Sequence, residues 1–138
     1  MTGVQTCALP ISQLIKSPAE PEVLEWISAQ EEDDLLVSAM SIFEIRSGVD
    51  QLKPGKKRTL LENWLTLEIM PRFAGRIVPV DERMADAAGK MMGEGHHEGR
   101  DTDSSDALIA ATAKVLGLKI ATLNRKHFEP LGAQLVKF

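Results

Sequence analysis

The sequence predicts an α/β fold in which a parallel sheet is flanked by helices. Short apolar runs typical of buried strands occur at 35–38, 77–80 and 119–122, and stretches with helical periodicity lie between them. Strands that alternate with helices along a chain form parallel sheets, because each connection crosses back over the sheet. With 138 residues, the chain is long enough for one domain with its own core.

The composition is that of an ordinary soluble globular protein, with 43% hydrophobic and 26% charged residues. No apolar run approaches the length of a membrane span, and no basic segment precedes an apolar one at the N-terminus, so neither a membrane helix nor a signal peptide is expected. The single cysteine excludes an internal disulfide and suits a reducing cytoplasm. The net charge of −4 argues against broad, nonspecific coating of nucleic acid, although a local basic patch stays compatible with it.

Two helices are predicted in the first third of the chain. One starts at Pro21, a favoured first helical position, and ends before the charged loop 31–34. Its apolar residues recur at helical spacing: Val23, Leu24 and Ile27. The second covers 39–49 and ends near Gly48. Its inner stripe consists of Ile42, Ile45 and Val49.

The next predicted helix follows the turn at Pro54 and Gly55 and runs to about Met70. Its core face consists of Leu61, Trp64, Leu65 and Ile69. Its first turn carries the cationic triplet 56–58, which opposes the helix dipole by some tenths of a kcal/mol per charge. Contact with phosphate and an ordinary exposed basic turn explain this triplet equally well.

A further helix is predicted from the capping residue Asp81 to about Gly95. The residues expected to face inward are Met84, Ala88, Met91 and Met92. The helix ends at His96-His97-Glu98. Adjacent helical residues point apart and histidines suit a helix C-terminus, so this triplet indicates a helix end rather than a metal site.

The most apolar helix follows the loop 99–105. Between Ala107 and Leu116 only Thr112 and Lys114 are polar, so this helix is expected to be buried. Asp103 and Asp106 stand at its start and, taken alone, resemble a capping box. Further acids elsewhere in the chain are needed before these two carboxylates indicate an active site.

Several polar residues are predicted to meet at one edge of the sheet. In open α/β sheets, ligands bind beyond the carboxyl ends of the strands. Ser38, Thr122 and Asn124 come at this edge, and Glu44 and Asp106 are able to reach it. A last short strand is expected at 135–136.

Three segments, 38–48, 106–113 and 122–128, resemble the later motifs of PIN-domain ribonucleases in their order and spacing. The resemblance is to the VapC/FitB-type toxins of bacterial type II toxin–antitoxin pairs and covers 12–138. It implies a PIN-like fold and a cytoplasmic, Mg²⁺- or Mn²⁺-dependent endoribonuclease that cleaves RNA with metal-activated water. It also implies a cognate antitoxin and a homodimer as partners.

The resemblance also implies a role for each site residue. Glu44 and Asp106 correspond to metal-binding acids, and Asn124 takes the position of a fourth catalytic acid. The supporting residues are Thr122, which would orient its loop, Arg46, which would pair with an acid or phosphate, Ser38 and Asp103. Mg²⁺ prefers oxygen ligands, and a bound divalent cation lowers the pKa of water and stabilises phosphodiester charge.

The N-terminal segment departs from the family pattern. Residues 1–11 resemble a translated sequencing-library adapter, so we treat them as non-native and 12–138 as a single PIN-like domain. The family opens with a strand that ends in Asp-Thr-Asn, and these positions fall on Cys7, Ala8 and Leu9, while Gln13 replaces a further acid. The first strand is therefore expected to be missing or replaced, with unpaired neighbours and impaired nuclease activity.

Two other classes of function compete with the ribonuclease. The first is a catalytically inactive PIN-like binding module that dimerises and captures an antitoxin, and a complete acidic cluster separates the enzyme from it. The second is a phospho-accepting receiver, which needs an early acid pair and a lysine after a late strand. Asn124 follows that strand instead, so the receiver ranks low.

Overall fold

The computed structural model describes residues 13–15 and 21–137. Its centre is a four-stranded sheet with the order β3-β2-β1-β4, in which every pairing is parallel. The strands are β1 (Gln13–Ile15), β2 (Leu35–Ser38), β3 (Ile77–Val78) and β4 (Lys119–Ala121). A single parallel bridge between Ile120 and Leu135 extends the sheet beyond β4, where a short strand was expected.

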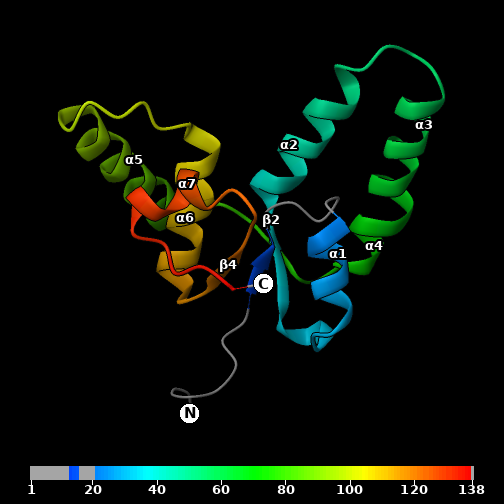
Figure 1. Ribbon diagram of the computed structural model, residues 1–138, viewed down its shortest axis with the longest axis horizontal. Helices are drawn as coiled ribbons and strands as arrows, with labels where there is room; N and C mark the ends of the chain where they lie inside the picture. The colour runs from blue at the N-terminus through cyan, green and yellow to red at the C-terminus, as the bar shows by residue number, and fades with distance from the viewer. Residues whose placement is uncertain (1–12, 16–20, 138) are drawn as a thin grey trace.

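The helices cover both faces of this sheet. Figure 1 shows α5, α6 and α7 on one side and α1 to α4 on the other. Their bounds are α1 (Pro21–Ser28), α2 (Ala39–Asp50), α3 (Lys56–Asn63), α4 (Met70–Arg72), α5 (Glu82–His97), α6 (Ser104–Leu116) and α7 (Arg125–Phe128). A π-helix, η2 (Trp64–Ile69), joins α3 to α4, and short 3₁₀ turns lie at η1 (Glu32–Asp34) and η3 (Glu129–Leu131). The predicted α/β architecture with a parallel sheet is confirmed.

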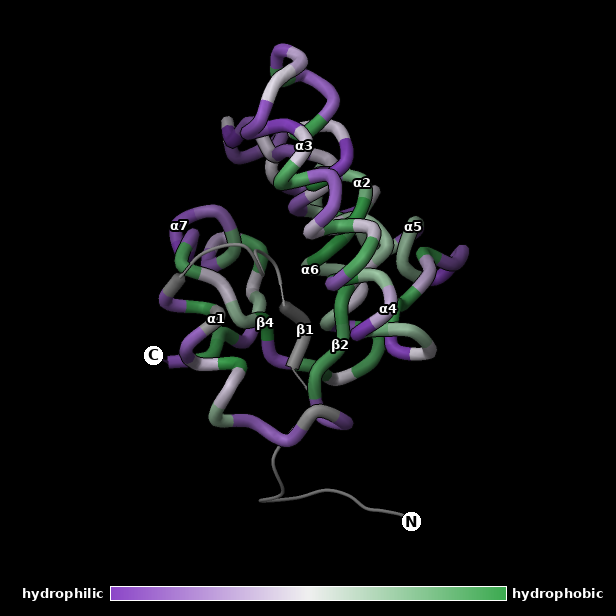
Figure 2. Tube along the Cα trace, turned by 90° about the vertical axis from the view of Figure 1, so that its right-hand side faces the viewer, coloured by the Kyte–Doolittle hydropathy of each residue, from purple (hydrophilic) through white to green (hydrophobic). Residues whose placement is uncertain are grey.

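Alternation along the strands divides the interior into two cores. Leu35 and Val37 pack with the α1 and η2 side, whereas Leu36 faces the α5 and α6 side. In β4, Ile120 belongs to the α6 core and Ala121 to the opposite one. Successive strand side chains point to opposite faces, so strands covered on both sides are apolar throughout. Figure 2 shows this apolar centre and the hydrophilic turn between α2 and α3.

Helix α6 is the buried helix that its sequence predicts. Eight of its residues are buried: Ser105, Asp106, Ala107, Ile109, Ala110, Ala111, Thr112 and Ala113. The Thr112 hydroxyl donates to the Leu108 carbonyl at 2.7 Å, which satisfies a polar group that has lost its water. The helix ends at Gly117, whose φ of 68° is accessible to glycine at little cost.

The predicted range 39–49 for α2 is correct to within one residue, but Gly48 does not end the helix. The helix continues to Asp50 and its C-cap is Gln51. Val49 is only 3% exposed, so packing of the residue after Gly48 holds the helix together through the glycine. Burial of Val49 here outweighs the cost of a glycine inside a helix, which is about 1 kcal/mol relative to alanine.

Helix α5 ends at His97 with Glu98 as its C-cap, which agrees with the predicted helix end at 96–98. Two smaller expectations need correction. Met92 is 37% exposed and does not face inward, because its neighbour Met91 takes the core position. Strand β3 stops at Val78, since Pro79 has no N–H with which to continue the ladder.

A central strand is present in the sheet. Gln13–Ile15 pairs with Leu35–Val37 on one side and with Lys119–Ala121 on the other. The expected loss of pairing at the sheet centre is therefore wrong, because these residues satisfy both neighbours. Cys7, where the family pattern places its first acid, lies outside the described residues.

Within the described ranges, none of the helices is long and apolar enough to span a bilayer.

Candidate metal centre

Three carboxylates converge above the carboxyl ends of the strands. One oxygen each from Glu44, Asp103 and Asp106 lies within 4.8 Å of the others. Glu44 comes from α2, and the two aspartates come from the start of α6. Two of these acids were predicted as metal-site residues and the third as a supporting residue, and the fold brings all three together.

Helix α2 carries Glu44 to this edge directly from β2. Ser38 ends the strand and caps the helix, with its hydroxyl oxygen accepting from the Met40 N–H at 3.0 Å. Ser38 is fully buried, so this bond also satisfies a hydroxyl inside the protein. Its role in the structure is to start α2 at the sheet edge, and Glu44 follows on the helix with a half-buried side chain.

Asp103 acts as a cap and is also a member of the cluster. Its Oδ1 accepts a hydrogen bond from the Asp106 N–H at 3.0 Å, which defines it as the N-cap of α6. This bond satisfies one of the free N–H groups at the helix start and fixes the backbone of Asp106. The capping interpretation of the sequence is therefore correct for Asp103, and the cap does not exclude a second role.

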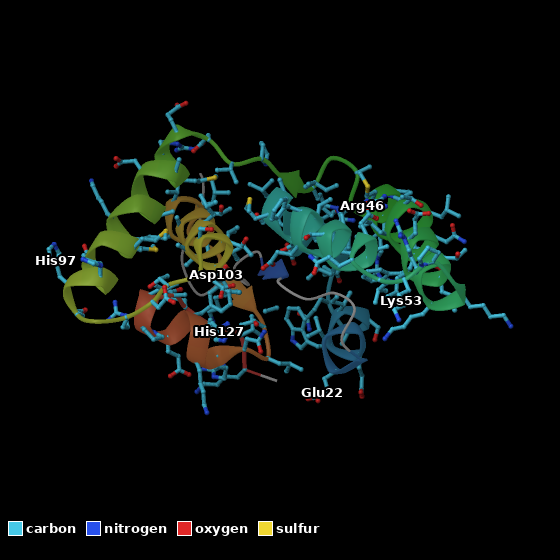
Figure 3. All side chains as sticks on the ribbon, turned by 90° about the horizontal axis from the view of Figure 1, so that it is seen from above. Glu22, Arg46, Lys53, His97, Asp103 and His127 are labelled. Atoms are coloured by element: carbon cyan, nitrogen blue, oxygen red, sulfur yellow. The ribbon has the colours of Figure 1, made fainter. Side chains whose placement is uncertain are left out.

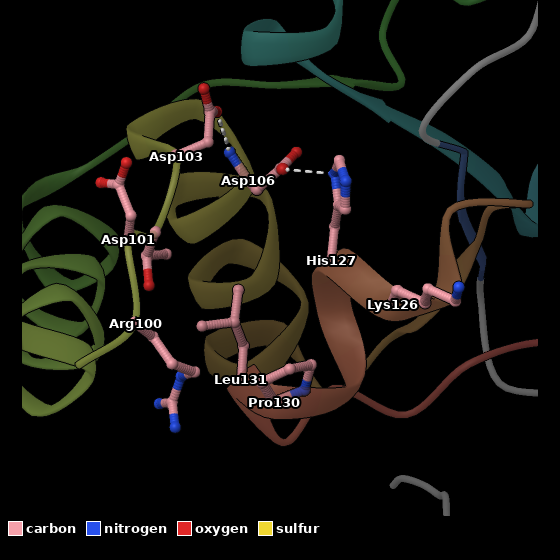
Figure 4. A pocket seen from close by; sticks show the side chains of 9 residues that line it. Arg100, Asp101, Asp103, Asp106, Lys126, His127, Pro130 and Leu131 are labelled. Atoms are coloured by element: carbon pink, nitrogen blue, oxygen red, sulfur yellow. Dashed lines mark hydrogen bonds and ion pairs between the residues drawn. The ribbon is translucent and has the colours of Figure 1, made fainter. Parts of the chain in front are cut away.

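His127 contacts Asp106 from a third element. Its Nδ1 lies 3.1 Å from Oδ2 of Asp106, across the gap between α7 and α6 (Figure 4). The side chain of Asp106 is 9% exposed, whereas that of His127 is 60% exposed. Sequence reasoning gave no role to His127. Its only signal was its place three residues after Asn124, in the same short motif.

A pocket of about 300 Å³ opens beside the acids. Its lining residues are Arg100, Asp101, Thr102, Asp103, Asp106, Lys126, His127, Pro130 and Leu131. Figure 4 shows Asp103, Asp106 and His127 grouped at one end, with Arg100, Pro130 and Leu131 at the other. Carboxylates and cationic side chains thus line the same pocket, which suits a ligand with both a bound cation and a phosphate.

The remaining predicted residues occupy different places. The Thr122 hydroxyl oxygen is buried and accepts from the Asn124 N–H at 3.0 Å, so Thr122 orients the turn that leads into α7. Asn124 is exposed, and no side-chain hydrogen bond from it occurs within the described part of the chain. Arg46 pairs with Glu62 at 3.0 Å and with Asp50 at 3.4 Å, along α2 and α3 and outside the acidic cluster. Figure 3 shows Arg46 apart from Asp103 and His127.

The donor set fits a hard divalent cation. All three clustered side chains offer carboxylate oxygens, the ligands that Mg²⁺ and Mn²⁺ prefer. Asp106 is nearly buried, so its negative charge is costly unless it is paired or binds a cation. His96 and His97 form the last turn of α5, and Glu98 is its C-cap, so the triplet is the helix end that was predicted.

Comparison with known proteins agrees with this architecture. The PIN domain family profile matches residues 11–131. This chain belongs to the PIN domain family. The match begins at the last residue of the segment 1–11, and it includes all three acids of the cluster.

Relatives of this PIN domain match most of the chain. It is 34% identical over 126 residues to VapC ribonuclease Y4jK of Sinorhizobium fredii, covering 91% of this chain and 90% of the relative. It is 34% identical over 118 residues to Toxin FitB of Neisseria gonorrhoeae, covering 86% of this chain and 85% of that protein. The predicted resemblance to VapC and FitB proteins is thus confirmed.

Solved structures share the fold. The crystal structure of FitAcB from Neisseria gonorrhoeae superposes with a TM-score of 0.77 at 30% identity, covering 91% of this chain and 96% of the other. VapBC-1 from nontypeable Haemophilus influenzae superposes with a TM-score of 0.67 at 18% identity, covering 93% and 98% of the two chains. The expected PIN-like fold is therefore confirmed.

Proposed function

We propose that this PIN domain is a metal-dependent endoribonuclease toxin of a toxin–antitoxin pair, with impaired catalysis in the chain as it stands. The observation that carries the proposal is the convergence of Glu44, Asp103 and Asp106 within 4.8 Å at the carboxyl edge of a parallel sheet. Relatives named VapC ribonuclease and toxin FitB support the same activity class.

Each site residue has a role in this proposal. Glu44, Asp103 and Asp106 would hold a Mg²⁺ or Mn²⁺ ion, and Asn124, at the position of the family's fourth acid, would be the catalytic residue. A divalent cation bound there would lower the pKa of water and offset charge on the phosphodiester. Lys126 and Arg100, on the pocket wall, attract the RNA backbone, and Thr122 orients the turn that carries Asn124.

The proposed impairment follows from a missing carboxylate at the front of the domain. The family pattern expects an acid after the first strand, at the position that falls on Cys7. In the sheet, the central strand is Gln13–Ile15, and the residues that follow it in the sequence are Lys16 and Ser17. Neither location supplies a carboxylate, and a thiolate is too soft a ligand to replace one on Mg²⁺.

The test is cleavage of a mixed pool of single-stranded and structured RNAs in the presence of Mg²⁺ or Mn²⁺. The purified chain is expected to cleave weakly or not at all. The triple substitution Cys7→Asp, Ala8→Thr and Leu9→Asn restores the family motif, and Lys16→Asp supplies an acid directly after β1. Cleavage is expected to rise in one of these variants, and the responding variant identifies which segment serves the site.

Two results would contradict the proposal at different points. Strong cleavage by the unsubstituted chain, abolished by Glu44→Ala, would contradict the proposed impairment. Absence of cleavage in both acid-restored variants would contradict the proposed enzyme activity. It would favour the alternative function, a PIN-like module that captures an antitoxin without cutting RNA. The missing acid is the observation that favours this alternative function.

The proposal includes two protein partners, a cognate antitoxin and a second copy of the chain. Large apolar side chains are exposed on α2, α3 and η2, where Phe43 is 59%, Leu60 68% and Leu67 69% accessible. Large exposed apolar residues such as these are candidates for a protein interface. Light scattering is expected to show that the parent chain is a dimer and that the double variant Leu60→Lys, Leu67→Lys is a monomer. A double variant that is still a dimer would place the dimer interface elsewhere.

A further inference from the structure

We propose that His127 is a positioning residue that holds the Asp106 carboxylate in the orientation needed for cation binding. This inference rests on the proposed metal-dependent function and adds a residue outside the acidic cluster. Its basis is the 3.1 Å contact between Nδ1 of His127 and Oδ2 of Asp106.

Helix α7 holds His127 in place although the ring itself is 60% exposed. The next residue, Phe128, is fully buried in the α6 core. Arg125, on the same helix, donates to the Val136 carbonyl at 3.1 Å and pairs with Glu129 at 3.3 Å. The backbone that carries the ring is therefore anchored by apolar burial on one side and by polar contacts on the other.

Asp106 is held at two points. Its N–H donates to the Asp103 cap, which fixes the backbone, and His127 contacts the carboxylate, which fixes the side chain. An ionised carboxylate only accepts hydrogen bonds, so Nδ1 of His127 must carry the hydrogen. In a neutral imidazole this selects the Nδ1–H tautomer and leaves Nε2 as an acceptor on the exposed side of the ring.

The consequence for the site is an ordered ligand. A carboxylate with one oxygen engaged by His127 keeps lone pairs for a cation shared with Glu44 and Asp103. Hydrogen bonds that orient a ligand from outside the coordination shell typically change metal affinity by about 10- to 100-fold when they are removed.

The contact itself is tested without metal or RNA. In ¹⁵N-histidine-labelled protein at about pH 8.5, where histidine side chains are mostly neutral, His127 is expected in the Nδ1–H tautomer. In Asp106→Ala, this tautomer is expected to give way to Nε2–H. The same tautomer in both proteins would overturn the proposed contact.

The positioning role is tested by Mn²⁺ affinity, measured as free Mn²⁺ by electron paramagnetic resonance. His127→Ala is expected to weaken Mn²⁺ binding by about 10- to 100-fold. His127→Asn is expected to recover most of that loss, because its amide N–H replaces Nδ1–H. His97→Ala is the matched control, since His97 is an exposed histidine at the end of α5. Equal affinity in His127→Ala and the parent would overturn the role.

Failure of the proposed function gives a different pattern. A parent chain with the Nδ1–H tautomer but no Mn²⁺ binding, even with an acid restored at residue 7 or 16, would overturn the metal-dependent function and with it the positioning role. A parent that binds Mn²⁺ with no dependence on His127 would overturn only the positioning role.

Discussion

At the scale of single residues, one carboxylate often serves stability and chemistry together. Asp103 accepts the Asp106 N–H as the cap of α6 and also places an oxygen in the acidic cluster. The two roles need different properties. Capping needs a hydrogen-bond acceptor, whereas cation binding needs a charge.

Paired substitutions at Asp103 separate these roles. Asp103→Asn is expected to keep the stability of the parent, because asparagine caps helices about as well as aspartate, while Mn²⁺ affinity falls. Asp103→Ala is expected to lose the affinity and also about 0.5–2 kcal/mol of stability. Urea unfolding and Mn²⁺ titration on the same samples measure both. If Asp103→Asn binds Mn²⁺ as the parent does, Asp103 is a cap alone.

At the scale of helices, two glycines differ in whether their backbone conformation requires glycine. Gly48 lies inside α2 and a Cβ there would meet nothing within 4 Å. Gly117 follows α6 with a φ of 68°, a conformation that an L side chain rarely adopts. The same substitution to alanine therefore has opposite consequences at the two sites.

Gly48→Ala is expected to stabilise the protein by about 0.4–1 kcal/mol, because it removes backbone freedom from the unfolded chain at a compatible site. Gly117→Ala is expected to destabilise it by roughly 1–2 kcal/mol, because the left-handed conformation becomes strained. Chemical denaturation of both variants checks the pair. A loss of stability in Gly48→Ala would show that α2 does not continue as a helix through residue 48.

Helix α5 offers a test of pH dependence. Its cap, Asp81, accepts the Met84 N–H at 3.0 Å and pairs with Arg83 at 2.9 Å. These contacts, the Met84 bond first, hold the pKa of the Asp81 carboxyl below its usual value of 3.8. Because this pKa is lower in the folded state, the ionised carboxyl stabilises the folded state at pH values above the pKa of the unfolded state. This contribution is lost as the pH falls through the pKa of the folded state.

The stability difference between the parent and Asp81→Asn is therefore expected to shrink as the pH falls below about 4. Asparagine keeps the capping acceptor, so the charge is the part that changes between the two proteins. Urea midpoints from neutral pH to pH 3 measure the difference. A difference that stays constant over this range would show that the charge of Asp81 contributes nothing.

At the scale of the whole molecule, the site is assembled from both helical layers. Glu44 belongs to α2, on the side of α1 to α4, whereas Asp103 and Asp106 belong to α6, on the opposite side (Figure 1). In the proposed function, a cation shared between these acids would link the two layers. Binding to the folded state alone stabilises it by mass action.

Mn²⁺ is accordingly expected to raise the free energy of unfolding, by about 2.7 kcal/mol when free Mn²⁺ reaches 100 times its dissociation constant. A chelator is expected to reverse the gain, and Asp106→Ala to abolish it. Urea unfolding with and without Mn²⁺ provides the measurement. An equal gain in Asp106→Ala would place the stabilising cation outside the acidic cluster.

Local patterns in the sequence correctly predicted most elements of the fold. Helical spacing predicted α1 and the apolar side of α5, and the capping residues Asp81 and Asp103 stand at the starts of their helices. Gly48 and Met92 were misjudged because packing against the rest of the protein, which a local pattern does not contain, decides both. The central strand Gln13–Ile15 was missed for the same reason, since pairing with two distant strands defines it.

The sequence by itself determined that acids stand beside the carboxyl ends of strands, because the succession of strands and helices along the chain, capping and helical spacing are local properties. Only the tertiary structure decided that Asp103 joins Glu44 and Asp106, and that His127 reaches Asp106 across 21 positions of the chain. Helices α2, α6 and α7 are brought together by burial of their apolar faces against the sheet. The distances between their polar ends follow from that packing, and no single segment encodes them.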